Sequence, residues 1–130
     1  MKKIVKSAEE WRKELSEQEF DVCRMHGTEP AFTGMYWDVK KEGTYHCRCC
    51  GEPLFESEAK FDSGTGWPSF WKPVSKDAVE FTVDSSHGMT RTEVHCAKCD
   101  CHLGHVFPDG PAPTHERYCI NSVSLKLEED

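Results

Sequence analysis

Two Cys-x-x-Cys motifs, Cys47 with Cys50 and Cys96 with Cys99, restrict the folding of this chain more than any other sequence feature. Two such pairs are typical of a closed, tetrahedral, structural zinc site with Zn–S distances of about 2.3 Å. A site of this kind would tie the middle of the chain to the strand that leads into His102. We therefore expect one structural zinc ion per chain.

Cysteines at positions 49 and 101 offer rival spacings for the same site. In a metal knuckle, the residue after the second cysteine often needs a positive φ, which suits Gly, Asn or Asp. Gly51 follows Cys50, and Asp100 follows Cys99, whereas Cys49 is followed by another cysteine. This favours the ligand set Cys47, Cys50, Cys96 and Cys99. The rival interpretation, a redox Cys-x-x-Cys, usually opens a helix in a βαβ pattern that this sequence lacks.

Length and charge exclude several classes of protein. With 130 residues, the chain suits a single domain, residues 1–130, with one core. A net charge of −7 disfavours a phosphate-binding surface, so we expect no nucleic-acid partner. The sequence has no apolar run long enough to span a membrane and no apolar segment typical of a signal peptide. Eight cysteines in such a chain indicate metal and redox chemistry in a reducing compartment, the cytoplasm.

Local patterns predict a mainly β fold with a short helical segment at the N-terminus. Ser7 with Glu10 and Ser16 with Glu19 form two capping boxes, which predict two short helices in residues 1–25, packed on the β core. Alternating apolar and polar residues predict short strands at 44–46, 79–84, 89–95 and 120–127.

Cys119 has a distinctive sequence environment. Residues two apart in a strand share a face, so Arg117 and Asn121 would point the same way as the Cys119 thiol. A free thiol has a pKa of about 8.5, so only about 3% is thiolate at pH 7. A neighbouring cation favours the thiolate, which is the nucleophile. From these residues alone, the alternative of an inert cysteine in a core strand stays open.

His102 and His105 allow several interpretations. As zinc ligands they would be surplus to four cysteines, and as core residues they would need partners for both ring nitrogens. As acid–base groups they suit a reaction near neutral pH. The residues alone do not choose between a structural and a catalytic role.

A set of motifs, taken together and in order, resembles the peptide-methionine (R)-S-oxide reductases, the MsrB family. The resemblance runs roughly from Trp11 to Leu127 and no single motif carries it. It implies a fold of two antiparallel sheets, β-sandwich-like or barrel-like, with a four-cysteine zinc site. The motifs are Gly27-Thr28-Glu29-Pro30, Phe32-Thr33-Gly34, Cys47-x-x-Cys50-Gly51, Phe61-Asp62-Ser63-Gly64, Gly66-Trp67-Pro68-Ser69-Phe70, His102-Leu103-Gly104-His105-Val106-Phe107, Asp109-Gly110-Pro111 and Arg117-Tyr118-Cys119-Ile120-Asn121.

The resemblance also implies an activity and a site. The reaction is reduction of the R epimer of methionine sulfoxide, in proteins or peptides and as the free amino acid, to methionine. Cys119 would attack the sulfoxide sulfur and become a sulfenic acid, which then needs a thiol. The other residues that the resemblance assigns to catalysis are His102, His105, Arg117, Asn121 and Asp109. Those assigned to substrate binding are Trp67, whose ring would pack against the substrate methyl, and Phe70 and Phe107.

The chain departs from the family pattern at Thr65, where many members carry the cysteine that resolves the sulfenic acid. We expect Cys23 to be the internal candidate for this step, because it lies outside both knuckles in a segment that could move. Cys49 and Cys101 lie beside zinc ligands and are more restricted. Thioredoxin or a similar thiol acting directly on Cys119 is the other route. We expect a monomer.

Two other classes of function compete with the reductase. A zinc-ribbon module would bind nucleic acid, and the excess of acidic over basic residues argues against such binding. A zinc-held redox sensor would react once with an oxidant and yield no methionine.

Overall fold

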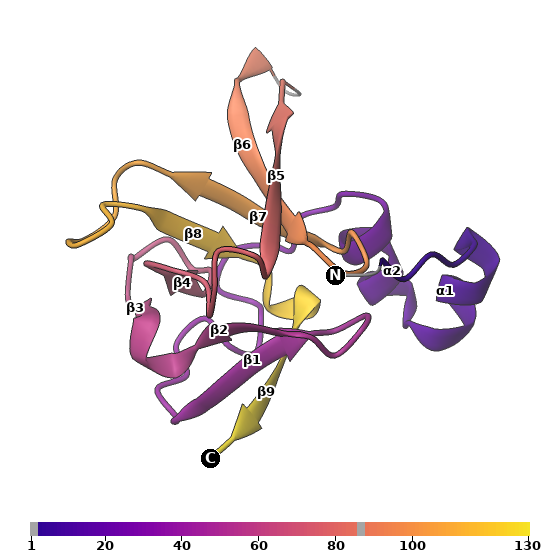
Figure 1. Ribbon diagram of the computed structural model, residues 1–130, viewed down its shortest axis with the longest axis horizontal. Coiled ribbons are helices and arrows are strands. Elements are labelled where there is room, and N and C mark those ends of the chain that lie inside the picture. Colours follow the sequence, from indigo (N-terminus) through magenta and orange to yellow (C-terminus); the bar gives the residue numbers. More distant parts are fainter. Residues whose placement is uncertain (1–2, 86–87) are drawn as a thin grey trace.

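The computed structural model describes residues 3–85 and 88–130, which form two antiparallel sheets and two short helices (Figure 1). The first sheet has the order β2-β1-β9, and the second has the order β3-β4-β8-β7-β6-β5. The predicted mainly β fold with two antiparallel sheets is therefore confirmed. The strands are β1 (Gly43–Cys47), β2 (Pro53–Glu56), β3 (Lys60–Phe61), β4 (Ser69–Phe70), β5 (Val79–Asp84), β6 (Arg91–Cys96), β7 (His102–Phe107), β8 (Arg117–Ile120) and β9 (Leu125–Glu129).

Both predicted helices form at their capping boxes. Helix α1 (Ala8–Glu14) begins after Ser7, and α2 (Glu17–Arg24) begins after Ser16. In each box the serine accepts a hydrogen bond from the third helical residue, whose glutamate accepts one from the serine N–H. Helix α2 packs on β7 and on the 3-10 turn η3 (Ser122–Ser124). No helix among residues 3–85 and 88–130 has the length and apolar character needed to cross a bilayer.

The predicted strand at 120–127 is wrong, because the chain changes sheet in this region. β8 ends at Ile120, η3 follows, and β9 begins at Leu125 in the other sheet. Ser122 and Ser124 are buried in this crossing, where Ser124 Oγ donates a hydrogen bond to the His102 carbonyl at 2.7 Å. The crossing joins the two sheets directly behind Cys119.

The core lies between the two sheets and is rich in aromatic rings. Phe55 of β2 stacks on Phe70 of β4, with centroids 4.4 Å apart and planes 18° apart. Tyr45 of β1 meets the edge of Phe70, and Tyr118 of β8 lies against Phe55. Burying each such ring contributes about 1.5–3 kcal/mol, so this cluster fixes the position of β8 relative to the first sheet.

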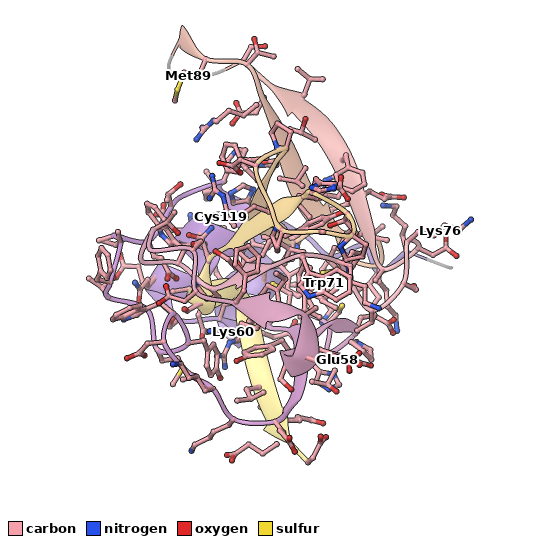
Figure 2. The ribbon with its side chains drawn as sticks, turned by 90° about the vertical axis from the view of Figure 1, so that its left-hand side faces the viewer. Glu58, Lys60, Trp71, Lys76, Met89 and Cys119 are labelled. Carbon is pink, nitrogen blue, oxygen red and sulfur yellow. The ribbon has the colours of Figure 1, made fainter. Side chains whose placement is uncertain are left out.

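One further element, the 3-10 turn η1 (Ser57–Ala59), joins β2 to β3. The β5–β6 hairpin projects beyond the body of the molecule (Figure 1), and residues 86 and 87 at its turn lie outside the described residues. In Figure 2, Cys119 lies between this hairpin, marked by Met89, and the region of Glu58 and Lys60.

Candidate active site and metal centre

Strand β8 presents Cys119 to a cavity of about 230 Å³. In the sheet, Cys119 pairs with His105 of β7 on one side and with Ser69 of β4 on the other. The alternation of the strand turns Tyr118 and Ile120 into the core and leaves Cys119 half-buried at the cavity. The lining residues are Thr28, Thr65, Trp67, Arg91, Gly104, His105, Phe107, Arg117, Cys119, Ile120 and Asn121.

Arg117 is held beside this cavity by an ion pair and a ring. Its Nε donates to Asp109 Oδ1 at 2.9 Å, and its Nη2 donates to Asp109 Oδ2 at 3.2 Å. The guanidinium also lies over the ring of Phe107, with Cζ 4.4 Å from the centroid. The hydrogen bonds and charge of Arg117 hold the pKa of Asp109 below its ordinary value. Asp109 therefore orients Arg117, while its own carboxylate is mostly exposed to solvent.

The Cys119 thiol experiences two opposing effects. Burial raises the pKa of Cys119, and the charge of Arg117 together with hydrogen bonds from Thr65 and Arg117 lowers it by less. The net direction is upward, so the flanking cation does not by itself make Cys119 a thiolate. In this structure Cys119 is a half-buried thiol whose ionisation Arg117 assists.

The wall opposite the sheet comes from the loop that contains Trp67. Trp67 Nε1 donates to the Glu29 carbonyl at 2.9 Å, which fixes the ring. Gly66 precedes it with a φ of 89°, and a Cβ there would lie 2.7 Å from the Phe32 ring, so only glycine fits. Thr65 lines the same cavity as Cys119, and its hydroxyl contributes to lowering the pKa of the thiol. A cysteine at position 65 would therefore meet Cys119 in the cavity.

Asn121 lines the cavity but uses its side chain to hold the framework. Its Oδ1 accepts from the Glu29 N–H at 3.0 Å, and its Nδ2 donates to the Leu103 carbonyl at 3.0 Å. Glu29 is itself buried, and its Oε1 accepts from the Val123 N–H at 2.9 Å. These bonds join the end of β8 to β7 and to the loop around Glu29.

The two histidines of β7 occupy different places. His105 lines the Cys119 cavity, and its Nε2 lies 2.9 Å from Asp84 Oδ2. His102 is buried and lines a second, adjacent cavity of about 240 Å³, to which His105 also contributes. Gly104 lets the strands come together here, because a Cβ at this position would overlap the Cys119 carbonyl oxygen.

Glu93 organises the second cavity and was not found from the sequence. Its Oε2 lies 2.6 Å from His26 Nδ1 and 2.8 Å from His102 Nδ1. The His102 contact is close but poorly aligned for a hydrogen bond, and Nε2 of His102 has no partner among the described residues. Burial lowers the pKa of His102 to about 4 despite the charge of Glu93, so His102 is neutral near pH 7. The sequence signal for this contact is the alternation that places Arg91 and Glu93 on one face of their strand.

Three residues assigned from the resemblance, Phe70, His102 and Asp109, do not line the Cys119 cavity. Phe70 pairs with Tyr118 across β4 and β8, so it faces the core as Tyr118 does and is fully buried. Phe70 therefore lies in the core rather than at the Cys119 cavity. Phe107 does line the cavity.

The structure places Cys23 away from the Cys119 cavity. Its side chain is 1% exposed on α2, and its sulfur contacts the Val123 carbonyl at 3.9 Å and Ser124 Oγ at 3.8 Å. The sulfur belongs to a group with Cys49 and Cys101, and Cys23 is not among the residues that line the Cys119 cavity. The helix that carries it is packed on β7 and η3, which opposes the swing that we expected.

The four paired cysteines form a cluster that could hold a metal ion. Cys47 Sγ lies 3.6 Å from Cys99 Sγ, and Cys50 Sγ lies 3.6 Å from Cys96 Sγ. Tetrahedral ligands at a Zn–S distance of about 2.3 Å are about 3.8 Å apart, so the sulfurs fit such an ion. The knuckles adopt the predicted backbone, with φ values of 82° at Gly51 and 63° at Asp100. All four sulfurs lie within 4.8 Å of one another.

Comparison with known proteins agrees with this arrangement. The family model described as the SelR domain matches residues 15–129. Among curated relatives, "Peptide methionine sulfoxide reductase MsrB" of Acinetobacter baylyi is 58% identical over 130 residues, which are 100% of this chain and 94% of the relative. The proteins of the same name from Pseudomonas fluorescens and Pseudomonas putida are 61% and 62% identical, with 98% of this chain and 98% and 96% of the relatives covered.

Proposed function

The chain belongs to the SelR domain family, and we propose that it is a peptide-methionine (R)-S-oxide reductase with Cys119 as its nucleophile. The observation that carries the proposal is a lone thiol in a cavity that also contains a fixed tryptophan and a histidine. The named relatives are similar to this chain over nearly its whole length. The substrate is therefore methionine sulfoxide, and the reductant, which is oxidised in the reaction, is a thiol.

The cavity contains the groups that this reaction needs. In the first step the Cys119 sulfur takes the sulfoxide oxygen, which leaves methionine as the thioether and Cys119 as a sulfenic acid. The sulfoxide oxygen must receive a proton as its bond to sulfur breaks, and the thiol must lose one. The Trp67 ring offers an apolar wall for the substrate methyl, while a polar donor is needed for the oxygen. A site that places these two groups on opposite sides of the sulfur selects one epimer.

His105 is the histidine best placed to donate to the sulfoxide oxygen. It pairs with Cys119 across the sheet and lines the same cavity. When both ring nitrogens carry hydrogens, Nε2 donates to Asp84 and Nδ1 is left for the substrate oxygen. His102 is neutral and sits one cavity further away, so its role is to position His105 and the Glu93 network. Asp109 and Asn121 act through Arg117 and the β8 backbone.

Recycling in this chain uses an external thiol that reacts at Cys119. A first thiol attacks the sulfenic acid, forms a mixed disulfide with Cys119 and releases water. A second thiol then displaces Cys119 and leaves the reductant as a disulfide. The support for this route is the presence of Thr65 beside Cys119 and the burial of Cys23 away from the cavity. Thioredoxin or a similar dithiol is the reductant that we propose.

The four-cysteine cluster holds one structural zinc ion in this proposal. Cys47, Cys50, Cys96 and Cys99 supply only thiolates, and a closed four-sulfur site suits zinc. The ion joins the β1–β2 turn to the β6–β7 turn and takes no part in the reaction. Residues 1–130 then act as one monomeric domain. None of the eight cysteines forms a disulfide, which suits a reducing compartment such as the cytoplasm.

The test is an assay with separated epimers. The protein is incubated with a peptide that contains either R or S methionine sulfoxide and with excess dithiothreitol, and methionine is measured. We expect methionine from the R epimer and none from the S epimer, with Cys119→Ser as the inactive control. Methionine from the S epimer alone would contradict the epimer assignment. No methionine from either, or equal yields from Cys119→Ser, would contradict the activity or the nucleophile.

A further inference from the structure

Three cysteines outside the four-cysteine cluster meet in one place. The sulfurs of Cys23, Cys49 and Cys101 all lie within 4.8 Å of one another. Cys23 and Cys101 are buried, at 1% and 0% exposure, and Cys49 is partly exposed. Neither the proposed reaction nor the zinc site uses any of them. We call these three residues the tri-thiol cluster.

The fold brings the tri-thiol cluster together from three elements that are distant in sequence. Cys49 lies in the β1–β2 turn, Cys101 lies between β6 and β7, and Cys23 lies on α2. Both turns are found on the side of the molecule that faces α2 (Figure 1). The same knuckles that aim four sulfurs inward for zinc thus aim two more sulfurs at the helix.

We propose that the tri-thiol cluster is a second metal site, which takes one soft, monovalent, thiophilic ion of the Cu(I) type. Soft thiolate donors select Cu(I) and zinc among the common metals. Zinc in closed structural sites takes four protein ligands, whereas Cu(I) is stable with three sulfurs in a plane. Among the described residues, no histidine or carboxylate joins this group to supply a fourth donor. Binding replaces the thiol protons by sulfur–metal bonds and changes no oxidation state.

The surroundings of the tri-thiol cluster fit an ion rather than apolar packing. Arg24, the last residue of α2, interacts with Cys49 and donates from Nη1 to the Cys99 carbonyl at 2.9 Å. A guanidinium at this position offsets negative charge on sulfur. Partly exposed Cys49 provides the entry path that a metal site needs.

The experiment measures metal content in the full-length, zinc-loaded protein. Cu(I) is supplied without oxygen in the presence of a competing Cu(I) chelator, the protein is separated, and copper and zinc are counted per chain. We expect one retained Cu(I) per chain with zinc unchanged. Cys101→Ala and Cys49→Ser should each weaken Cu(I) retention by at least about tenfold, since even outer-shell changes cost that much. Cys119→Ala, which removes a thiol elsewhere, should retain Cu(I) as the parent does.

Zinc content reports on folding in these variants, because the four zinc ligands are left intact. If Cys101→Ala loses zinc, the buried substitution has disturbed the fold. Cu(I) retention by Cys49→Ser, at a partly exposed position, then tests the proposal. The proposal is overturned if no Cu(I) is retained, if copper enters only as zinc leaves, or if Cys119→Ala loses as much Cu(I) as Cys101→Ala. Uptake of a second zinc ion in place of Cu(I) would overturn the assignment of a three-coordinate monovalent ion. None of these outcomes depends on methionine formation, so the test is independent of the proposed activity.

Discussion

The eight cysteines of this chain occupy two contrasting regions. Seven lie where the β1–β2 and β6–β7 turns approach α2. Four of them form the four-cysteine cluster and three form the tri-thiol cluster. The eighth, Cys119, stands alone in a cavity between β8 and the Trp67 loop. In the first region every sulfur has other sulfurs as neighbours. In the second the neighbours of the sulfur are Arg117, Thr65 and an open space.

The contrast shows that burial alone does not decide the chemistry of a thiol, because its neighbours differ between the two regions. Cys119 is half-buried and Cys49 is too, yet one faces a cavity with a histidine and the other faces two thiols. Converging thiols can share a cation, and a thiolate bound to a metal is no longer a free nucleophile. A single thiol beside a guanidinium and a substrate cavity keeps its reactivity for the substrate.

The largest expected effect comes from breaking the cysteine-rich region. Cys96→Ser should remove the metal ion and unfold the protein at 25 °C. Structural zinc contributes about 10–16 kcal/mol of apparent binding free energy in small peptides, whereas a whole domain is stable by about 5–15 kcal/mol. Zinc content and thermal unfolding by circular dichroism measure the effect. A metal-free Cys96→Ser protein with the melting temperature of the parent would show that the two turns hold together without the ion.

The next effect separates the two regions. Cys119→Ser should abolish reduction of methionine sulfoxide while the zinc content and the melting temperature stay within the error of the parent. The hydroxyl of serine is a far weaker nucleophile, and Cys119 has no metal neighbour whose loss could unfold the chain. Methionine formation, metal content and unfolding are measured on one preparation. Turnover within about tenfold of the parent would remove Cys119 from the role of nucleophile.

Features of the metal region were accessible from local sequence because they depend on backbone geometry. The positive φ at Gly51 and Asp100 follows from the knuckle itself, and the two capping boxes define where α1 and α2 begin. The common direction of Arg117, Cys119 and Asn121 follows in the same way from the alternation of a strand.

Features that depend on how elements pack were not accessible. Glu93 contacts His26 and His102 next to a β-bulge between Val94 and His95, where the register of β6 on β7 changes. Phe70 turned out to be a core residue because its partner across the sheet is Tyr118, a pairing between residues far apart in sequence. The sequence around Cys23 does not indicate that its sulfur lies near those of Cys49 and Cys101, because this proximity depends on where α2 packs on the sheet.

Moving a thiol into the catalytic region should change recycling more than reduction. Thr65→Cys places a second thiol next to Cys119, and we expect a disulfide between them after one reaction with substrate. Trapping of the sulfenic acid by dimedone should fall by at least about tenfold, since two groups held in one cavity react at a very high effective concentration. Mass spectrometry of the substrate-treated proteins measures both products. Thr65→Ser, which adds no thiol, is the matched control and should label as the parent does. Undiminished labelling of Thr65→Cys would mean that the two side chains do not meet.

The smallest expected effect concerns how Arg117 tunes the thiol. Burial raises the pKa of Cys119 above its ordinary value, so its alkylation by iodoacetamide should rise with pH without a plateau below about pH 8.5. Arg117→Ala removes the charge and hydrogen bond that oppose burial, so the pKa should rise further. A shift of one unit lowers the thiolate fraction at pH 7.5 about tenfold, or about 1.4 kcal/mol. Arg117→Lys keeps the charge but loses the two-pronged contact with Asp109, so its rate should lie between the two. Mass spectrometry of the peptide that contains Cys119 separates this reaction from that of the other seven thiols. If the alkylation rate of the parent reached a plateau below pH 8, or if its pH dependence were unchanged in Arg117→Ala, another group would control the ionisation of Cys119.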